Sequence, residues 1–377
     1  MKRVLLNGLN STTGGGKSIL DNYLSLLEES DNNDTYFVLV SDAEEYQRFS
    51  NNHVEVVDIK WFFKISFLFP ITYKYVLPRL IKSLRIDVIF NLADIPIPIS
   101  GVRQVFLFDW PYAVYPESSV WKSMDLKSFV VRKVKLKFFS YYLKYITVMI
   151  AQTETIKNRL IRLYGARDII VVPNAVTLEH SNTENYFNFS MPKGKLLLCL
   201  SHYYPHKNFE IFIPLAKAIK RLALDYKIIV TIEASHHQKA KEFLKQVKHF
   251  GLSDIIYNVG VVEMGDVPSL FQQCDALLMP TLLETYCLPY VEAMQNRRLI
   301  ITSDMDFSRD VCGDAGIYFD PLDHRSILES IESIFSNGPL RELKLTKGEM
   351  RLRALNSWPT VVNKYINILG GSTIEDK

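Results

Sequence analysis

Cysteine is scarce in this chain of 377 residues, and its spacing excludes the usual metal and disulfide frameworks. The four cysteines, at Cys199, Cys274, Cys287 and Cys312, include no C-x-x-C pair, and the eight histidines form no H-E-x-x-H pattern. Scattered cysteines are typical of buried thiols in a reducing compartment. We therefore expect neither a structural disulfide nor a metal site.

Long apolar runs are missing as well. The N-terminal segment MKRVLLNGLN holds an apolar run of only three residues, whereas a signal peptide needs about 7 to 15. A membrane span needs about 20, and the best candidate, residues 61–78, is interrupted by Lys64, Pro70 and Lys74. These absences predict a protein that is cytoplasmic or bound to a membrane face. Together with the basic segment described below, they favour a peripheral location at the inner face of the cytoplasmic membrane.

No charge of one sign dominates the chain. Lys and Arg number 44 and Asp and Glu 41, which gives a net charge of +3. Nucleic-acid-binding domains are usually far more basic, so nucleic acid is not an expected partner.

One local segment is strongly basic: WKSMDLKSFVVRKVKLKFFSYYLKY, residues 121–145. It holds seven Lys or Arg and one Asp, interleaved with aromatic and branched residues. An amphipathic helix of this composition can lie on an anionic membrane surface. The alternative is a solvated outer helix whose apolar face packs on a sheet.

Short apolar runs that alternate with helix-like segments are abundant. Continuous Val, Ile and Leu runs of this kind predict parallel strands covered by helices on both faces. They form two series, so we expect an α/β protein with two doubly wound domains. The expected strands span residues 3–8, 36–41, 87–92, 104–109, 147–152 and 169–173, then 195–201, 227–234, 255–260, 276–281 and 299–304.

A polar, aperiodic stretch at residues 175–194 separates the two series and reads as a linker. The predicted domains are therefore residues 1–175 and 190–355. Residues 356–370 form a last helix that is expected to pack back on the first domain.

The segment NGLNSTTGGGKS, residues 7–18, looks like the phosphate-binding loop of an NTPase. A Walker A motif requires G-x-x-x-x-G-K-[ST], but Ser11 occupies the position of its first glycine. The glycines, including Gly16, instead suit a ligand-facing loop at a helix start, where free N–H groups attract anions. A simple tight turn is the alternative, and Lys17 is expected to point to solvent.

The stretch PTLLETYCLPYVEAMQNRRLIITSD, residues 280–304, carries two carboxylates eight positions apart. Glu284 falls in a loop after an expected strand, and Pro289 suits the first turn of the helix that holds Glu292. One carboxylate can then face sugar hydroxyls and the other a ribose. The N–H groups of Tyr286–Leu288 would face a diphosphate at the helix start.

Lys207 follows the first strand of the second series, in LSHYYPHKNFEIFIPLAKAI, and a helix begins directly after it. Its ammonium group could neutralise a diphosphate, although a lysine in a loop is more often simply solvated.

With these motifs in place, the second half resembles the retaining glycosyltransferases of the GT-B fold, of the group 1 (family 4) type. The resemblance extends from the Lys207 segment through YNVGVVEMGDVPSLFQQCDALLMPTLLETYCLPYVEAM and RDVCGDAGIYFDPLD to the tryptophan-bearing last helix. The first half fits more loosely, through the glycine loop and residues 151–176. GT-B implies two Rossmann-like domains facing a central cleft, with the acceptor on the first and the nucleotide sugar on the second.

The resemblance also implies roles for individual residues. Lys207 would bind the donor diphosphate, Glu292 the ribose hydroxyls, and Glu284 would face the donor sugar as a catalytic group. The amides of Tyr286, Cys287 and Leu288 would support sugar and phosphate. Further donor contacts are implied for Gly260 and Val262, which would wall the nucleobase, and for Gly16, which would face the diphosphate from the first domain.

The chain departs from the family pattern in the donor site. Thr285 and Cys287 stand where glycines are common, so their side chains can narrow the sugar pocket. Ser201 replaces a basic residue six positions before Lys207. We therefore expect Ser201 or His206 to support the phosphate.

A third departure lies in the first domain, within VFLFDWPYAVYPE. Phe108 replaces a histidine that is common in the family, while Asp109 is retained. Asp109 is the remaining polar candidate for a catalytic role in positioning donor or acceptor. The alternative is that it only caps a turn.

The resemblance implies transfer without cofactor or metal, from a UDP- or GDP-sugar to a lipid-linked glycan in surface-polysaccharide or O-antigen-type biosynthesis. Lys207, loop amides and helix N-termini can stabilise the leaving diphosphate electrostatically. A sugar-nucleotide epimerase, a phosphorylase or a non-catalytic sugar-nucleotide-binding protein on the same fold are the alternatives.

Overall fold

The computed structural model describes residues 1–12, 14–28, 33–59, 68–175, 190–235 and 237–371. The chain divides into two compact units. The first comprises Met1–Pro116, Met124–Ala175 and Asn356–Lys377, and the second comprises Glu117–Ser123 and Val176–Leu355. Most of the stretch expected as a linker, residues 175–194, lies outside the described residues.

The first unit is built on a seven-stranded sheet in the order β3-β2-β1-β4-β5-β6-β7. All neighbouring strands run parallel; Leu5 of β1, for example, is level with Phe37 on one side and Ile89 on the other. The strands are β1 (Arg3–Gly8), β2 (Thr35–Val40), β3 (Val54–Val57), β4 (Val88–Asn91), β5 (Arg103–Leu107), β6 (Val148–Ala151) and β7 (Ile169–Val171).

The second unit repeats this order in a six-stranded parallel sheet, β10-β9-β8-β11-β12-β13. In each sheet the chain first winds one way and then reverses, so each has one switch point, between β1 and β4 and between β8 and β11. The strands are β8 (Lys195–Cys199), β9 (Tyr226–Val230), β10 (Ile256–Asn258), β11 (Ala276–Met279), β12 (Leu299–Ser303) and β13 (Gly316–Phe319).

Every strand expected from the sequence is present, with slightly different ends. The prediction missed two strands, β3 and β13, which form outer edges of the two sheets. Each is four residues long; one residue of β3 and two residues of β13 are fully buried. Such short edge strands need no continuous apolar run, so the pattern that reveals central strands does not reveal them.

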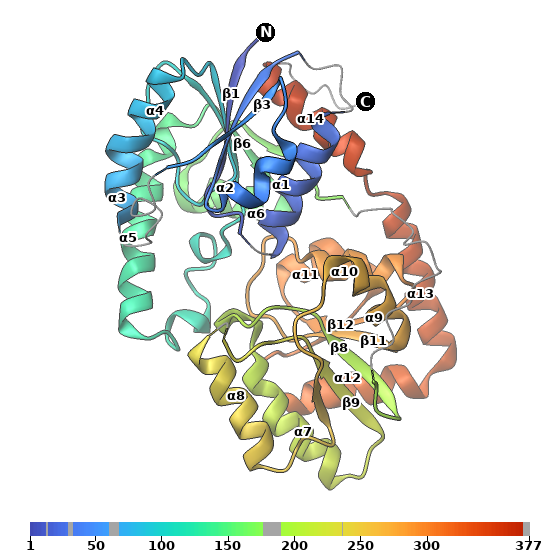
Figure 1. Ribbon diagram of the computed structural model, residues 1–377. Helices are drawn as coiled ribbons and strands as arrows, with labels where there is room; N and C mark the ends of the chain where they lie inside the picture. Colours follow the sequence, from blue (N-terminus) through green and yellow to red (C-terminus); the bar gives the residue numbers. More distant parts are fainter. Residues whose placement is uncertain (13, 29–32, 60–67, 176–189, 236, 372–377) are drawn as a thin grey trace. The chain divides into compact units, whose positions relative to one another are not determined.

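The last helix, α14 (Trp358–Gly370), packs beside α1 (Gly14–Leu27) in the first unit (Figure 1). Tyr23 of α1, Phe90 of β4 and Tyr365 of α14 form an aromatic cluster; the Phe90 ring centroid lies 5.3 Å from each of the other two. The remaining α-helices of this unit are α2 (Ala43–Tyr46), α3 (Phe69–Ile71), α4 (Leu77–Ser83), α5 (Leu126–Tyr142) and α6 (Glu154–Tyr164).

The α-helices of the second unit surround a core made mainly of Leu, Ile, Val and Ala side chains. They are α7 (Phe212–Arg221), α8 (Gln238–His249), α9 (Val267–Gln273), α10 (Leu288–Gln295), α11 (Asp306–Cys312), α12 (His324–Ser336) and α13 (Gly338–Arg353).

The basic segment expected as a helix over residues 121–145 is α-helical only in α5, which begins at Leu126. Asp125 caps this helix, because its carboxylate accepts a hydrogen bond from the N–H of Ser128 at 2.9 Å. Ser119–Trp121 instead forms a 3₁₀ turn, within a segment that belongs to the second unit. The capping aspartate therefore fixes a later start than composition alone suggested.

Candidate functional site

The second sheet brings two charged residues together at its switch point. β8 lies beside β11, with Leu197 level with Ala276. Lys207 ends a 3₁₀ turn that follows β8, and Glu284 lies in the loop between β11 and α10. Open α/β sheets bind ligands at the carboxyl ends of their strands at such reversals of strand order. This position makes the pair the primary candidate site.

Lys207 and Glu284 form a buried ion pair, with the lysine Nζ donating to Glu284 Oε1. Only 11% and 10% of their side chains are exposed. Burial alone would lower the pKa of Lys207, but the adjacent carboxylate outweighs it and holds the pKa above its ordinary value. Lys207 is therefore a fixed positive charge at the carboxyl edge of the sheet.

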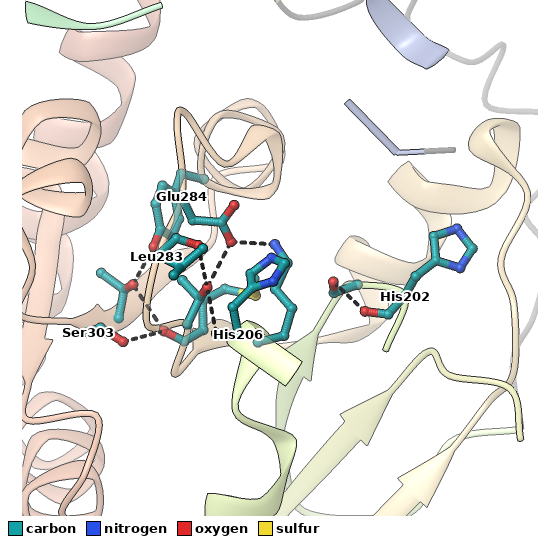
Figure 2. Close-up of polar contacts among 11 residues, drawn as sticks. His202, His206, Leu283, Glu284 and Ser303 are labelled. Atoms are coloured by element: carbon teal, nitrogen blue, oxygen red, sulfur yellow. Dashed lines mark hydrogen bonds and ion pairs between the residues drawn. The ribbon is translucent and has the colours of Figure 1, made fainter. Parts of the chain in front are cut away.

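Thr281 connects the carboxylate to the turn that carries the lysine. Its hydroxyl donates to Glu284 Oε1 at 2.9 Å and lies 3.3 Å from the backbone carbonyl oxygen of His206. The N–H of Leu282 donates to the same carbonyl oxygen at 2.8 Å. Figure 2 shows Glu284 and His206 drawn together by these contacts. The loop after β11 and the turn after β8 are thus held as one piece.

Asn208 closes the turn on its other side. Its backbone is left-handed, with φ of 58°, a conformation that asparagine tolerates better than most residues. Its side-chain amide donates to the carbonyl oxygens of Pro321, at 2.8 Å, and Pro280, at 3.2 Å. These bonds tie the lysine turn to the ends of β13 and β11.

Helix α10 begins immediately after the Glu284 loop, and Pro289 lies in its first turn as predicted. Cys287 occupies the N-cap position with φ of 66°, a left-handed backbone that glycine adopts more easily. Tyr286 is 3% exposed and its ring packs in the core of the second unit, so its backbone is the part suited to a ligand. The loop keeps a glycine-like path although it has lost the glycines.

Glu292 lies in the second turn of α10, between the buried side chains of Val291 and Ala293. Burial raises the pKa of its carboxyl group to about 7. Polar hydroxyl groups that donated to this carboxylate would favour its ionised form. The residue is therefore suited to recognise a diol, such as a ribose.

The two residues expected to support a phosphate differ in their surroundings. The Ser201 hydroxyl donates to the backbone oxygen of His202 at 2.8 Å, so it is used within its own turn. Figure 2 shows His202 turned away from Glu284. His206 directly precedes Lys207 and its ring stacks on Tyr204 at 5.4 Å. Support of a phosphate by either residue stays a prediction.

The loop expected as a nucleobase wall follows β10, an edge strand of the second sheet. Gly260 has φ of 80°, and its N–H donates to Asn258 Oδ1 at 3.2 Å. Val262 packs against the core, whereas Val261 is 48% exposed. The role of Gly260 and Val262 as a nucleobase wall stays a prediction.

In the first unit, Gly16 and Asp109 lie close together near Ser11. A Cβ added to Gly16 would stand 3.6 Å from Ser11 Oγ and 3.9 Å from Asp109 Oδ2. Lys17 does not point to solvent as expected, because its ammonium pairs with Asp21 at 2.8 Å and Glu45 at 2.7 Å. These acidic partners are a further reason to reject the NTPase reading.

Phe108, which stands at the family's histidine position, is fully buried and packs on Phe139 of α5, with ring centroids 5.8 Å apart. The substitution thus adds to the core of the first unit. Asp109 follows it, two residues beyond the end of β5.

Sequence reasoning missed Thr281 and Asn208, which position the charged pair. A buried threonine and a loop asparagine are common for many reasons, so their spacing gives no signal without the fold. Among the residues that the structure describes, no group of three His, Cys, Asp or Glu could hold a metal ion.

Comparison with solved structures defines the class of fold. The sucrose-phosphate synthase of Thermosynechococcus elongatus matches with a TM-score of 0.73 at 12% identity, over 99% of this chain and 100% of that one. The Anabaena protein Alr3699/HepE, solved with UDP-glucose, matches with a TM-score of 0.70 at 14% identity, over 98% and 100%. The chain has the GT-B fold, with a doubly wound parallel sheet in each unit.

Residues 182–346 match the family model of the glycosyl transferases group 1. This matched segment holds the Lys207–Glu284 pair, so the part of the second unit that carries the candidate site is similar to the group 1 glycosyltransferases. A curated relative, the O-antigen chain mannosyltransferase RfbU of Salmonella typhimurium, is 25% identical over 186 residues. That match covers 48% of each protein, so the chain spans about half the length of this relative.

Proposed function

We propose that this protein moves a sugar from a nucleoside-diphosphate sugar to a hydroxyl group of a glycan, with retention of configuration at the anomeric carbon. One observation carries the proposal: the buried Lys207–Glu284 pair lies at the β8–β11 switch point, with Glu284 in the loop that leads into α10. A fixed cation beside a helix N-terminus suits a diphosphate.

In the proposed complex, the donor diphosphate binds Lys207 and the N-terminal amides of α10. Lys207 has three N–H donors, and Glu284 engages one of them. The other donors can serve phosphate oxygens without the pair being broken. Glu284 then faces the sugar, and Glu292 accepts hydrogen bonds from the ribose hydroxyls.

The transfer step breaks the bond between the anomeric carbon and the phosphate oxygen. The acceptor oxygen forms the new bond on the same face, and its proton passes to the departing phosphate. Lys207 and the helix N-terminus stabilise the charge that develops on the diphosphate. The step needs no protein nucleophile, and these fixed charges take the role that a metal ion plays elsewhere.

We further propose that the acceptor is lipid-linked and that the protein works at the inner membrane face. The outer face of α5 supports this location, because apolar and basic side chains alternate on it. Leu126 is 78% exposed and Tyr141 65%. The other exposed residues of α5 are Lys127, Val130, Lys133, Val134, Lys137 and Ser140. None of the helices in the described ranges is long and apolar enough to cross a membrane.

Incubation with a panel of donors tests the transfer proposal. GDP-mannose is included because RfbU is named a mannosyltransferase, and UDP-glucose because Alr3699/HepE was solved with it. We expect one donor to give a glycosylated polyprenyl-diphosphate glycan whose new linkage keeps the donor's anomeric configuration. Binding without transfer to any acceptor would favour a non-catalytic protein. An epimerised sugar product would indicate an epimerase, and a phosphorolysed product would indicate a phosphorylase.

Cosedimentation with vesicles tests the location. The protein should bind vesicles that contain phosphatidylglycerol and not pure phosphatidylcholine vesicles. Replacing Lys127, Lys133 and Lys137 together with glutamine should abolish that binding, since each cation near the surface contributes about 1 kcal/mol. Equal binding of the variant would refute the role of α5.

A further inference from the structure

Two buried glutamines of the first sheet have opposite hydrogen-bonding states. Gln104 of β5 is fully buried and paired at both ends of its amide: its Oε1 accepts from Ile97 N–H at 2.8 Å, and its Nε2 donates to Ile97 O at 3.0 Å and Tyr145 O at 3.1 Å. Gln152, 1% exposed, has no partner for Oε1 or Nε2 among the described residues.

An unpaired buried amide opposes folding, because it gives up its hydrogen bonds to water and gains none. Buried polar groups without partners are rare in folded proteins and need a specific explanation. A ligand that supplies the missing partners is one such explanation, and the position of Gln152 favours it.

Gln152 lies one residue beyond β6, at the carboxyl edge of the sheet where open α/β folds bind ligands. In the pairing of β5 with β6, Leu107 is level with Ile150. Continued by two residues, this register puts Asp109 level with Gln152. Strand alternation assigns both to the face of Leu107 and Ile150, which share an apolar cluster with α1.

One more polar group, the hydroxyl of Ser11, lies near Asp109 just before the start of α1. Ser11 is 3% exposed, and its hydroxyl also has no partner among the described residues. Ser11 Oγ and Asp109 Oδ2 lie 3.6 and 3.9 Å from the point where a Cβ of Gly16 would stand. The glycine therefore leaves space between a hydroxyl and a carboxylate.

We propose that Gln152, Ser11 and Asp109 form a subsite for the hydroxyl groups of a neutral sugar ring. An amide and a hydroxyl both donate and accept hydrogen bonds, and a carboxylate accepts from two hydroxyls. The carboxylate also disfavours a phosphate at this place. The inference rests on the proposed sugar transfer and assigns the glycine loop to a neutral sugar rather than to the diphosphate.

Thermal unfolding of ligand-free Gln152→Leu and Gln104→Leu tests whether the amide of Gln152 is unpaired. The melting temperature of Gln152→Leu should equal that of wild type or exceed it by up to about 4 °C. Gln104→Leu should have a lower melting temperature than wild type, because loss of the Gln104 amide leaves backbone groups of Ile97 and Tyr145 unpaired. A loss of stability in Gln152→Leu like that in Gln104→Leu would overturn the proposal.

Saturation-transfer NMR with methyl α-mannoside and methyl α-glucoside then tests for the sugar. Wild type should give a signal with at least one, and Gln152→Leu should lose it, with a smaller loss in Ser11→Ala. Unchanged UDP-glucose and GDP-mannose affinities would assign the ring to the acceptor, and a parallel loss to the donor. No wild-type signal, or an unchanged variant signal, would contradict the subsite, whether or not the protein turns over any donor.

Discussion

The carboxyl edges of the two sheets have the same strand order and different chemistry. In the second unit, the switch point holds a buried cation, Lys207, paired with Glu284 in front of a helix. In the first, a glycine-rich helix start lies near Asp109, and its lysine, Lys17, is drawn to acidic residues. The shared topology decides where a ligand can bind, while the side chains decide its charge.

The largest effect is expected from removing the cation of the second unit. Lys207→Ala should lower turnover at least 100-fold, since it deletes the charge proposed to stabilise the leaving diphosphate. It should also destabilise the fold by about 3–5 kcal/mol, because Glu284 is left buried and unpaired. Donor turnover and urea unfolding measure the two effects.

A double variant separates these two effects. Lys207→Met with Glu284→Leu removes both charges, so most of the lost stability should return while turnover stays at least 100-fold below wild type. Recovery of activity along with stability would contradict a direct role for Lys207 in diphosphate binding.

The second prediction concerns pH and Glu292. Burial holds its pKa at about 7 in the folded protein, against an ordinary value of 4.5. The folded state therefore binds this proton more tightly than the unfolded state, and the stability contributed by the protonated form is lost as pH rises from about 4.5 to about 7. Glu292→Gln should match wild type in stability near pH 5 and exceed it at pH 8.

Donor affinity should follow the opposite trend. The ionised carboxylate accepts ribose hydroxyls best, so wild-type affinity should rise through pH 7. Glu292→Gln should bind about 10-fold more weakly at pH 8, as expected for a hydrogen bond to a charged group, with little pH dependence. Calorimetric titration at pH 5.5 and 8 checks this, and parallel pH profiles would refute the ribose role.

A smaller effect is expected at Thr281, whose hydroxyl positions Glu284 without touching the donor. Thr281→Val should lower kcat by about 10-fold, equivalent to one hydrogen bond of about 1–1.5 kcal/mol. The value of KM should change little, and Thr281→Ser should restore kcat. If serine fails to rescue, the loss reflects packing rather than positioning.

The smallest effect is expected in the first unit, at the lysine of the GGGKS segment. Lys17→Met removes two partly exposed ion pairs, each worth about 0–1 kcal/mol. Affinity for UDP and GDP should stay within twofold of wild type. A loss comparable to that of Lys207→Ala would restore the NTPase-like reading of this loop.

Sequence alone predicted the two parallel sheets, because buried central strands are written as continuous apolar runs. It missed β3 and β13, because these short edge strands are only partly buried and contain no such run. It selected Lys207 and Glu284 through a family resemblance, but their direct pairing and the Thr281 bridge depend on loops 70 residues or more apart in the chain. That the two domains face one cleft stays a prediction.

The sequence likewise contained no sign that the side-chain amide of Gln152 lacks hydrogen-bond partners among the described residues. A glutamine after a strand is usually solvated or paired, and the contrast with Gln104 emerges only from their surroundings.

Hydrogen exchange of the full chain with saturating UDP or GDP compares the two edges most directly. We predict slower exchange at residues 204–208 and 284–292, because the diphosphate binds beside Lys207 and the start of α10. Residues 14–18 should be unaffected by the free nucleotide. Protection confined to residues 14–18, with no change in the other two segments, would contradict the assignment of the diphosphate to the second unit.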